Sequence, residues 1–213
     1  MKKIVLMTVI SIFLYTIFAK EKPSGFGPIN FGENKPTAIK KLVEKYNLKK
    51  NNSNFYTSAG NILPGFLGMS IYVDQSFLTI KNFSIDETPF TVKLFFTKSQ
   101  NKFYGYTISS SEQDIINYLE IRKYGDFLAD IFEYKFGTPS AVNNYPDIFK
   151  VRENLISPYK IWDISGFDVK IGVTYNFKYY IQAVVFKLKE KEVEQKEGKK
   201  QYLKRIEQAS KQF

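Results

Sequence analysis

The sequence predicts an α+β protein with two consecutive helix-then-antiparallel-sheet units, helices covering one sheet face, and a charged C-terminal helix or tail. Two patterns favour this class. Apolar residues recur at helical spacing before each of two stretches in which apolar and polar residues alternate, as they do in half-buried strands. Aromatic residues, mostly Phe and Tyr, make up 17% of the 213 residues. These residue types suit pleated surfaces better than helix bundles.

The first segment, residues 1–19, is typical of a secretory signal peptide. Two lysines precede an apolar run over residues 4–18, and Ala19 supplies a small residue at the expected cut site. The run is shorter than the roughly 20 residues of a membrane-spanning helix. We therefore expect an exported protein of the periplasm or cell envelope, with an uncleaved N-terminal tether as the alternative. Residues 20–28 are interpreted as a linker.

The first unit is predicted over residues 29–109. Residues 29–31 form a short strand, Asn34 caps a helix, and Pro36 stands in its first turn, where a missing N–H costs nothing. One apolar stripe follows at helical spacing: Ile39, Leu42, Val43 and Tyr46. Residues 51–54 are a polar break, and residues 66–85 are one long strand or two shorter ones.

A hairpin closes this unit. Phe90, Val92, Leu94 and Phe96 alternate with Thr91 and Lys93, which are expected to face outward. Residues 86–88 form the preceding turn and residues 98–102 the following loop. Tyr104, Tyr106 and Ile108 are expected to face inward on the return strand, which predicts an antiparallel meander.

The second unit is predicted over residues 110–188 and begins with a helical region. Residues 109–111 are three serines that can cap it, and Gly125 can bend or interrupt it. Gly137 followed by Pro139 predicts its end. The apolar positions fall into two stripes: Ile115, Ile116 and Leu119, then Phe127, Leu128, Ile131 and Phe132.

Three strands are predicted after this helix. The first spans residues 159–164 and contains the sole tryptophan, Trp162, and Ser165–Gly166 forms a tight turn after it. The second alternates through residues 169–176. The third, residues 179–188, is apolar on both faces and is therefore expected inside the sheet or under a helix.

The composition changes after the last strand. Residues 187–213 hold nine basic and five acidic residues with few apolar ones. Segment 189–213 is either a solvated, partly helical tail or a helix whose thin stripe of Tyr202, Leu203 and Ile206 docks on a partner or an anionic surface.

Several pieces of the chain resemble a pattern in small exported bacterial proteins. The pattern has an Ile-x-Phe-Gly entry to a helix, a hydrophobic hairpin, a helix closed by Phe-Gly-x-Pro and a strand with Trp, here INFGENKPTAIKKL, FTVKLFFTKSQNKFYGYTIS, FLADIFEYKFGTPS and KIWDI. The chain is similar here to the β-lactamase-inhibitor-protein and outer-membrane assembly lipoprotein (SmpA/OmlA) group over residues 26–188. The resemblance implies binding or scaffolding by a sheet, without catalysis. The chain departs from the lipoproteins in having no cysteine for lipid attachment.

Catalysis is not expected. The chain has no Cys and no His, which removes thiolate nucleophiles and the commonest general base and metal ligand. Asp126, Asp130 and Glu133 fall near one helical face but are interpreted as its exposed side. We expect no enzyme, no cofactor and no metal site.

Net charge is +10, which indicates either a solvated surface or attraction to an anion. Export makes nucleic acid an improbable partner. The favoured function is binding or scaffolding of another envelope protein through the sheet surface. The alternative is binding of anionic lipid or cell-wall polymer through the C-terminal tail and a basic cluster on the first helix and its exit, with contacts from Lys40, Lys41, Lys45, Lys49 and Lys50.

Overall fold

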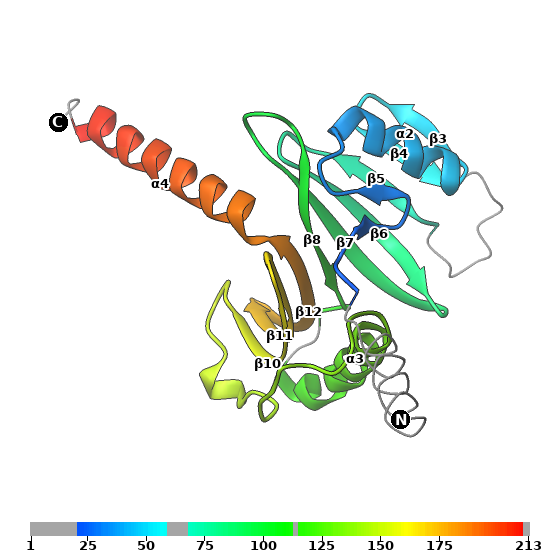
Figure 1. Ribbon diagram of the computed structural model, residues 1–213, viewed down its shortest axis with the longest axis vertical. Coiled ribbons are helices and arrows are strands. Elements are labelled where there is room, and N and C mark those ends of the chain that lie inside the picture. The colour runs from blue at the N-terminus through cyan, green and yellow to red at the C-terminus, as the bar shows by residue number, and fades with distance from the viewer. Residues whose placement is uncertain (1–20, 59–67, 113–114, 211–213) are drawn as a thin grey trace, which may run out of the picture.

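Ten of the strands that the structure describes form one continuous antiparallel sheet. The computed structural model describes residues 21–58, 68–112 and 115–210 (Figure 1). Ten of the described strands follow the order β3-β4-β5-β6-β7-β8-β12-β11-β10-β9, and β1 and β2 form a separate pair. The predicted fold class, with two helix-then-sheet units each covered by its own helix, is therefore wrong. Alternation within a strand does not reveal which distant strand it will pair with.

The described elements, in chain order, are β1 (Gly25–Phe26), β2 (Ile29–Asn30), α2 (Lys35–Lys45), β3 (Leu48–Asn52), β4 (Phe55–Ser58), β5 (Ser70–Val73), β6 (Phe77–Ile85), β7 (Thr88–Phe96), β8 (Phe103–Ser109), the 3-10 helix η1 (Ile115–Ile121), α3 (Arg122–Phe136), β9 (Ala141–Val142), the 3-10 helix η2 (Ile148–Lys150), β10 (Ile156–Ile164), β11 (Phe167–Asn176), β12 (Lys178–Lys187) and α4 (Leu188–Ser210).

The two halves of the sheet meet where β8 pairs with β12. Ala183 lies opposite Ile108, and Val185 lies opposite Tyr106. The core crosses the same junction, because the Phe90 ring on β7 lies 6.3 Å from Tyr124 and 6.2 Å from Phe127 on α3. One hydrophobic core therefore serves both halves, and α3 packs on β11 and β12.

The β6-β7 hairpin follows the predicted alternation. Phe90, Val92, Leu94 and Phe96 are all buried. Asp86 and Glu87 in the turn have φ of 47° and 63°. Positive φ at both central positions is the geometry of a tight hairpin turn whose twist matches the strands.

The prediction that Tyr104 faces the core is wrong. The register shifts so that Phe96 pairs with Phe103 while Phe95 pairs with Gly105. This bulge turns Phe103 to the core and leaves Tyr104 on the opposite face. An inserted residue moves the side chains that precede it to the other face of the sheet, and a strict alternation of inward and outward residues does not predict this change.

Helix α2 begins as predicted. The Asn34 side chain accepts a hydrogen bond of 2.9 Å from the Thr37 N–H, and Leu42 is fully buried. Lys35 is also buried, and its ammonium donates to the carbonyls of Asp74 and Gln75 in the turn between β5 and β6. Burial lowers the Lys35 pKa, although the nearby Asp74 carboxylate opposes this shift.

The region before α3 differs from its prediction. The hydroxyl of Ser110 accepts a 3.0 Å hydrogen bond from the Ile181 N–H on β12, so this serine ties two strands together. Leu119 is 74% exposed, whereas Tyr118 and Ile121 are buried. The helical register here is 3-10 with a kink at Asn117, which changes the buried face.

The end of α3 agrees with the prediction, and the sole tryptophan packs against this end. Gly137 has φ of 76°, and its N–H donates to the Glu133 carbonyl at 2.9 Å. The Trp162 indole N–H donates to the Gly137 carbonyl at 2.6 Å, and its ring meets Phe132 edge-on at 5.6 Å. Gly125 does not interrupt α3; it lies buried within it.

Helix α4 continues directly from β12 and projects away from the sheet (Figure 1). The predicted signal peptide over residues 1–19 lies outside the described residues.

Candidate binding surface

Each central strand turns alternate side chains away from the core, toward a face that we call the open face. On β7 this face carries Thr91, Lys93 and Phe95, the neighbours of the buried Val92 and Leu94. Helix α4 begins beside this face, since it contacts β8 and β12 and lines one hollow together with Phe95 and Tyr104. The open face is therefore the side of the sheet that the hydrophobic core does not cover, and it can contact a binding partner.

Four aromatic rings lie side by side on the open face. Phe77 pairs with Phe95, and the centroids are 6.4 Å apart. Phe95 lies 5.1 Å from Phe186 and 6.4 Å from Tyr104, and Phe186 and Tyr104 are 5.7 Å apart. Rings in such tilted and edge-on arrangements stabilise one another beyond their burial.

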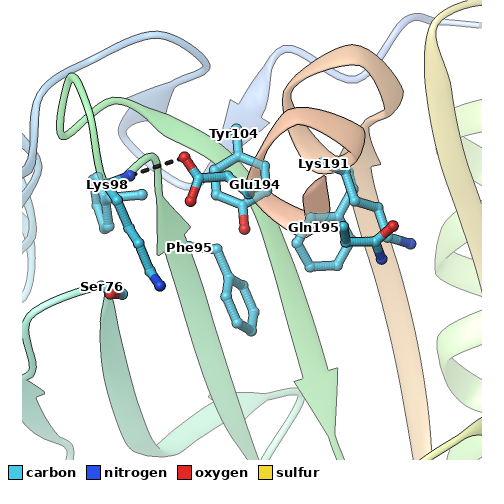
Figure 2. Close-up of a pocket in the computed structure, with 9 residues that line it drawn as sticks. Ser76, Phe95, Lys98, Tyr104, Lys191, Glu194 and Gln195 are labelled. Atoms are coloured by element: carbon cyan, nitrogen blue, oxygen red, sulfur yellow. Dashed lines mark hydrogen bonds between the residues drawn. The ribbon is translucent and has the colours of Figure 1, made fainter. Parts of the chain in front are cut away.

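The aromatic hollow lies between these rings and the base of α4, with a volume of about 330 Å³. Figure 2 shows side chains from the sheet and from α4 facing one another across it. The Lys98 N–H donates to Glu194 Oε1 at 2.9 Å. Burial, together with the Glu194 carboxylate, raises the pKa of Tyr104 to about 12, so this phenol stays neutral. The residues that line the aromatic hollow are Ser76, Phe95, Phe96, Lys98, Tyr104, Phe186, Lys191, Glu194 and Gln195.

A charge cluster centred on Asp168 of β11 holds the base of α4 against the sheet. The Lys191 ammonium lies 2.6 Å from Asp168 Oδ2, and that of Lys170 lies 3.1 Å from Asp168 Oδ1. Burial opposes ionisation of Asp168, but the two lysines outweigh it and its pKa lies below the usual value. The wall that α4 gives to the aromatic hollow is thus fixed by a partly buried charge cluster.

The polar hollow is a second depression of the open face, with a volume of about 600 Å³. Its two ammonium groups lie over rings, with Lys81 Nζ 5.3 Å from the Tyr72 centroid and Lys93 Nζ 5.7 Å from that of Phe77. The hollow is lined by Thr79, Lys81, Asn82, Thr91, Lys93, Ser109, Ser110, Ser111, Glu112, Asn176, Tyr180 and Gln182. It therefore offers hydroxyl, amide and ammonium groups to a ligand, together with the carboxylate of Glu112.

Of the five predicted contact lysines, three lie on α2 and two follow it on β3. Lys40 lies 3.9 Å from Glu44, and Lys41 lies 2.6 Å from Glu33. Lys45 lies over the Tyr46 ring at 5.8 Å. Much of the charge on α2 is thus compensated locally.

Lys49 and Lys50 lie on β3, in a segment that sequence analysis placed in a helix exit and a polar break. β3 is one edge of the ten-stranded sheet, and both lysines are exposed. Lysines on an edge strand oppose pairing with another chain. The other edge, β9, spans only Ala141–Val142. These edges are poor templates for strand addition, which leaves the open face as the candidate surface.

The carboxylates of α3 are spread among different partners. Asp126 lies 3.5 Å from Arg122, and Glu133 lies 3.0 Å from Lys160 on β10. Across the described part of the chain, no group of three or more Asp or Glu residues is placed to hold a metal ion. Within the same residues, no helix has the length and apolar character needed to cross a bilayer.

Sequence reasoning anticipated the outward residues of β7 but missed the aromatic hollow. The sequence feature that pointed to the hollow was the last strand, which is apolar on both faces and places Phe186 on the face opposite Val185. The bulge at Tyr104 and the start of α4 complete the hollow, and the place of α4 depends on the pairing of β12 with β8, which lie far apart in the sequence.

Comparison of the chain with protein-family models, characterised proteins and solved structures finds no match. The resemblance to the β-lactamase-inhibitor-protein and assembly lipoprotein group therefore stays a prediction.

Proposed function

We propose that this chain is a non-enzymatic, exported cell-envelope protein that binds another protein through the open face of its sheet. The observation that carries the proposal is the pair of hollows on that face, one aromatic and one polar and basic. Protein interfaces combine aromatic anchors with a polar surround in this way.

The aromatic hollow supports the binding of an apolar side chain of the partner. Phe95, Tyr104 and Phe186 give it rigid walls, and α4 closes one side through Lys191 and Glu194. A side chain placed here would exchange water for ring contacts, the usual source of affinity at an interface hot spot.

The polar hollow supports the recognition of acidic or hydroxyl-bearing groups beside that anchor. Lys81 and Lys93 are exposed, so a carboxylate of the partner can reach their ammonium groups, which lie over aromatic rings. We therefore propose a partner segment with acidic side chains next to an apolar one.

Site-specific crosslinking in the producing cells tests the proposal. A photoreactive amino acid replaces Thr91 on the open face, and the matched control places it at Lys123, which is exposed on α3. We expect one protein to crosslink from position 91 and not from position 123. Lys93→Glu should reduce that crosslink, because it places a like charge against the acidic segment.

Identical products from both positions, or the absence of any protein product from position 91, would refute binding through the open face. Extraction at moderate salt separates a protein partner from an anionic polymer, because polymer binding by exposed charges weakens steeply as salt rises. Fractionation and N-terminal sequencing of the same protein test export and cleavage after Ala19.

A further inference from the structure

The far half of α4 combines exposed apolar side chains with a concentration of positive charge. Tyr202, Leu203 and Ile206 are 63%, 55% and 47% exposed. Residues 196–208 include five basic and two acidic residues. The base of the helix is held by Lys191 and Glu194, whereas residues 201–208 are all exposed. The far half thus extends beyond the sheet as a separate surface (Figure 1).

The apolar and basic residues of this segment share one side of the helix. Tyr202 and Ile206 are four residues apart, so they lie one turn above each other. Lys196, Lys200 and Leu203 form the adjoining row at spacings of four and three, and Lys199 lies between the two rows. Lys196, Lys199, Lys200 and Lys204 line a shallow hollow of about 460 Å³ with Leu203 and Glu207.

We propose that the far half of α4 docks on the surface of an anionic lipid bilayer. Tyr202, Leu203 and Ile206 enter the boundary between headgroups and acyl chains, and the lysines contact lipid phosphates. Charge complementarity selects this occupant, because each basic residue near an anionic leaflet contributes about a five-fold factor in binding. Lysine stems also lie along apolar surface while their ammonium groups remain at the headgroups. The inference is independent of the open face.

A fluorescent label tests the docking position directly. Because the chain has no cysteine, Tyr202→Cys accepts a thiol-reactive, environment-sensitive fluorophore at one site. Tyr134→Cys is the matched control, since Tyr134 is 96% exposed on α3. With vesicles of phosphatidylglycerol and phosphatidylcholine, we expect a blue shift and an intensity rise at position 202 but not at position 134. Vesicles of phosphatidylcholine alone should give a much weaker response.

Charge variants test the contribution of the lysines. Titration through the label at position 202 should show about 25-fold weaker binding for Lys199→Gln/Lys200→Gln, from two factors of about five. The control Lys123→Gln/Lys150→Gln makes the same change in net charge on the body of the protein and should change binding little. Far-UV circular dichroism should be unchanged in both variants.

Three results would overturn the inference, two from the label and one from the charge variants. One is a label at position 202 that stays in water while the protein binds vesicles, which would assign membrane binding to another segment. Another is a label that responds equally to rising protein concentration without vesicles, which would assign the stripe to self-association. Equal loss of binding in both charge variants would refute the specific role of α4.

Discussion

The packing of α3 on β10 predicts that the effect of a substitution at Gly125 on stability depends strongly on the side chain at position 159. A Cβ atom on Gly125 would lie 1.8 Å from the Tyr159 hydroxyl oxygen and 3.1 Å from Ile181 Cδ1. Tyr159 is buried, and its ring packs against Tyr145 at 5.2 Å. The ring therefore has little space in which to withdraw.

Two opposing effects set the magnitude for Gly125→Ala. Overpacking a core costs about 1–3 kcal/mol. Alanine in a helix interior is more stabilising than glycine by about 0.5–1 kcal/mol, because glycine loses more backbone entropy on folding. We expect a net loss of about 1–2 kcal/mol in the free energy of unfolding, because both the helix and the sheet resist displacement.

Tyr159→Phe removes the clashing atom and provides the critical comparison. The Tyr159 hydroxyl is buried without a hydrogen-bond partner among the described residues. Its removal alone should change stability little, because no hydrogen bond is lost. When Tyr159→Phe is already in place, Gly125→Ala should be nearly neutral, because the nearest carbons, at 3.1 Å, need to move only a few tenths of an ångström and the higher helix propensity of alanine offsets that cost. The coupling free energy should be about 1–2 kcal/mol.

Urea unfolding of the four proteins in this cycle, followed by circular dichroism, measures the coupling. If the effects of the two substitutions add within about 0.5 kcal/mol, the contact with the Tyr159 hydroxyl is not the reason for glycine at position 125. A destabilising Tyr159→Phe substitution would show that the hydroxyl has a partner, such as a buried water.

Three further outcomes follow from other contacts. Trp162→Phe removes the hydrogen bond to the Gly137 carbonyl and should lower the free energy of unfolding by about 1.5–3 kcal/mol, measured with urea. Asp168→Asn should cost about 1–2 kcal/mol at neutral pH, since Asp168 makes charged hydrogen bonds in a partly buried cluster. Because the folded pKa of Asp168 is lowered, its contribution is present above its unfolded pKa of about 3.9 and is lost as pH falls through the folded pKa. Urea midpoints across acidic pH should therefore fall more for the wild type than for Asp168→Asn, and parallel curves would contradict this. Gly198→Ala in α4 meets open space and should increase helical circular dichroism, with a gain of up to about 1 kcal/mol in local helix stability.

The sequence by itself determined the local elements wherever one face of an element is buried along its length. The alternation from Phe90 to Phe96 predicted both a strand and its buried side, and the structure agrees. The end of α3 followed from Gly137 and Pro139, because positive φ and a missing N–H act within one or two residues. Such features depend on backbone geometry that the adjacent residues specify.

Only the tertiary structure decided how these elements combine. The pairing of β8 with β12 joins strands about 75 residues apart, and no local pattern encodes that choice. That pairing brings Phe186 and the start of α4 beside Phe95 and Tyr104, and the seating of Lys191 on Asp168 completes the aromatic hollow. Burial of the whole hydrophobic core selects the long-range pairing of the strands. The residues of the open face can therefore be assigned only when the order of all the strands is known.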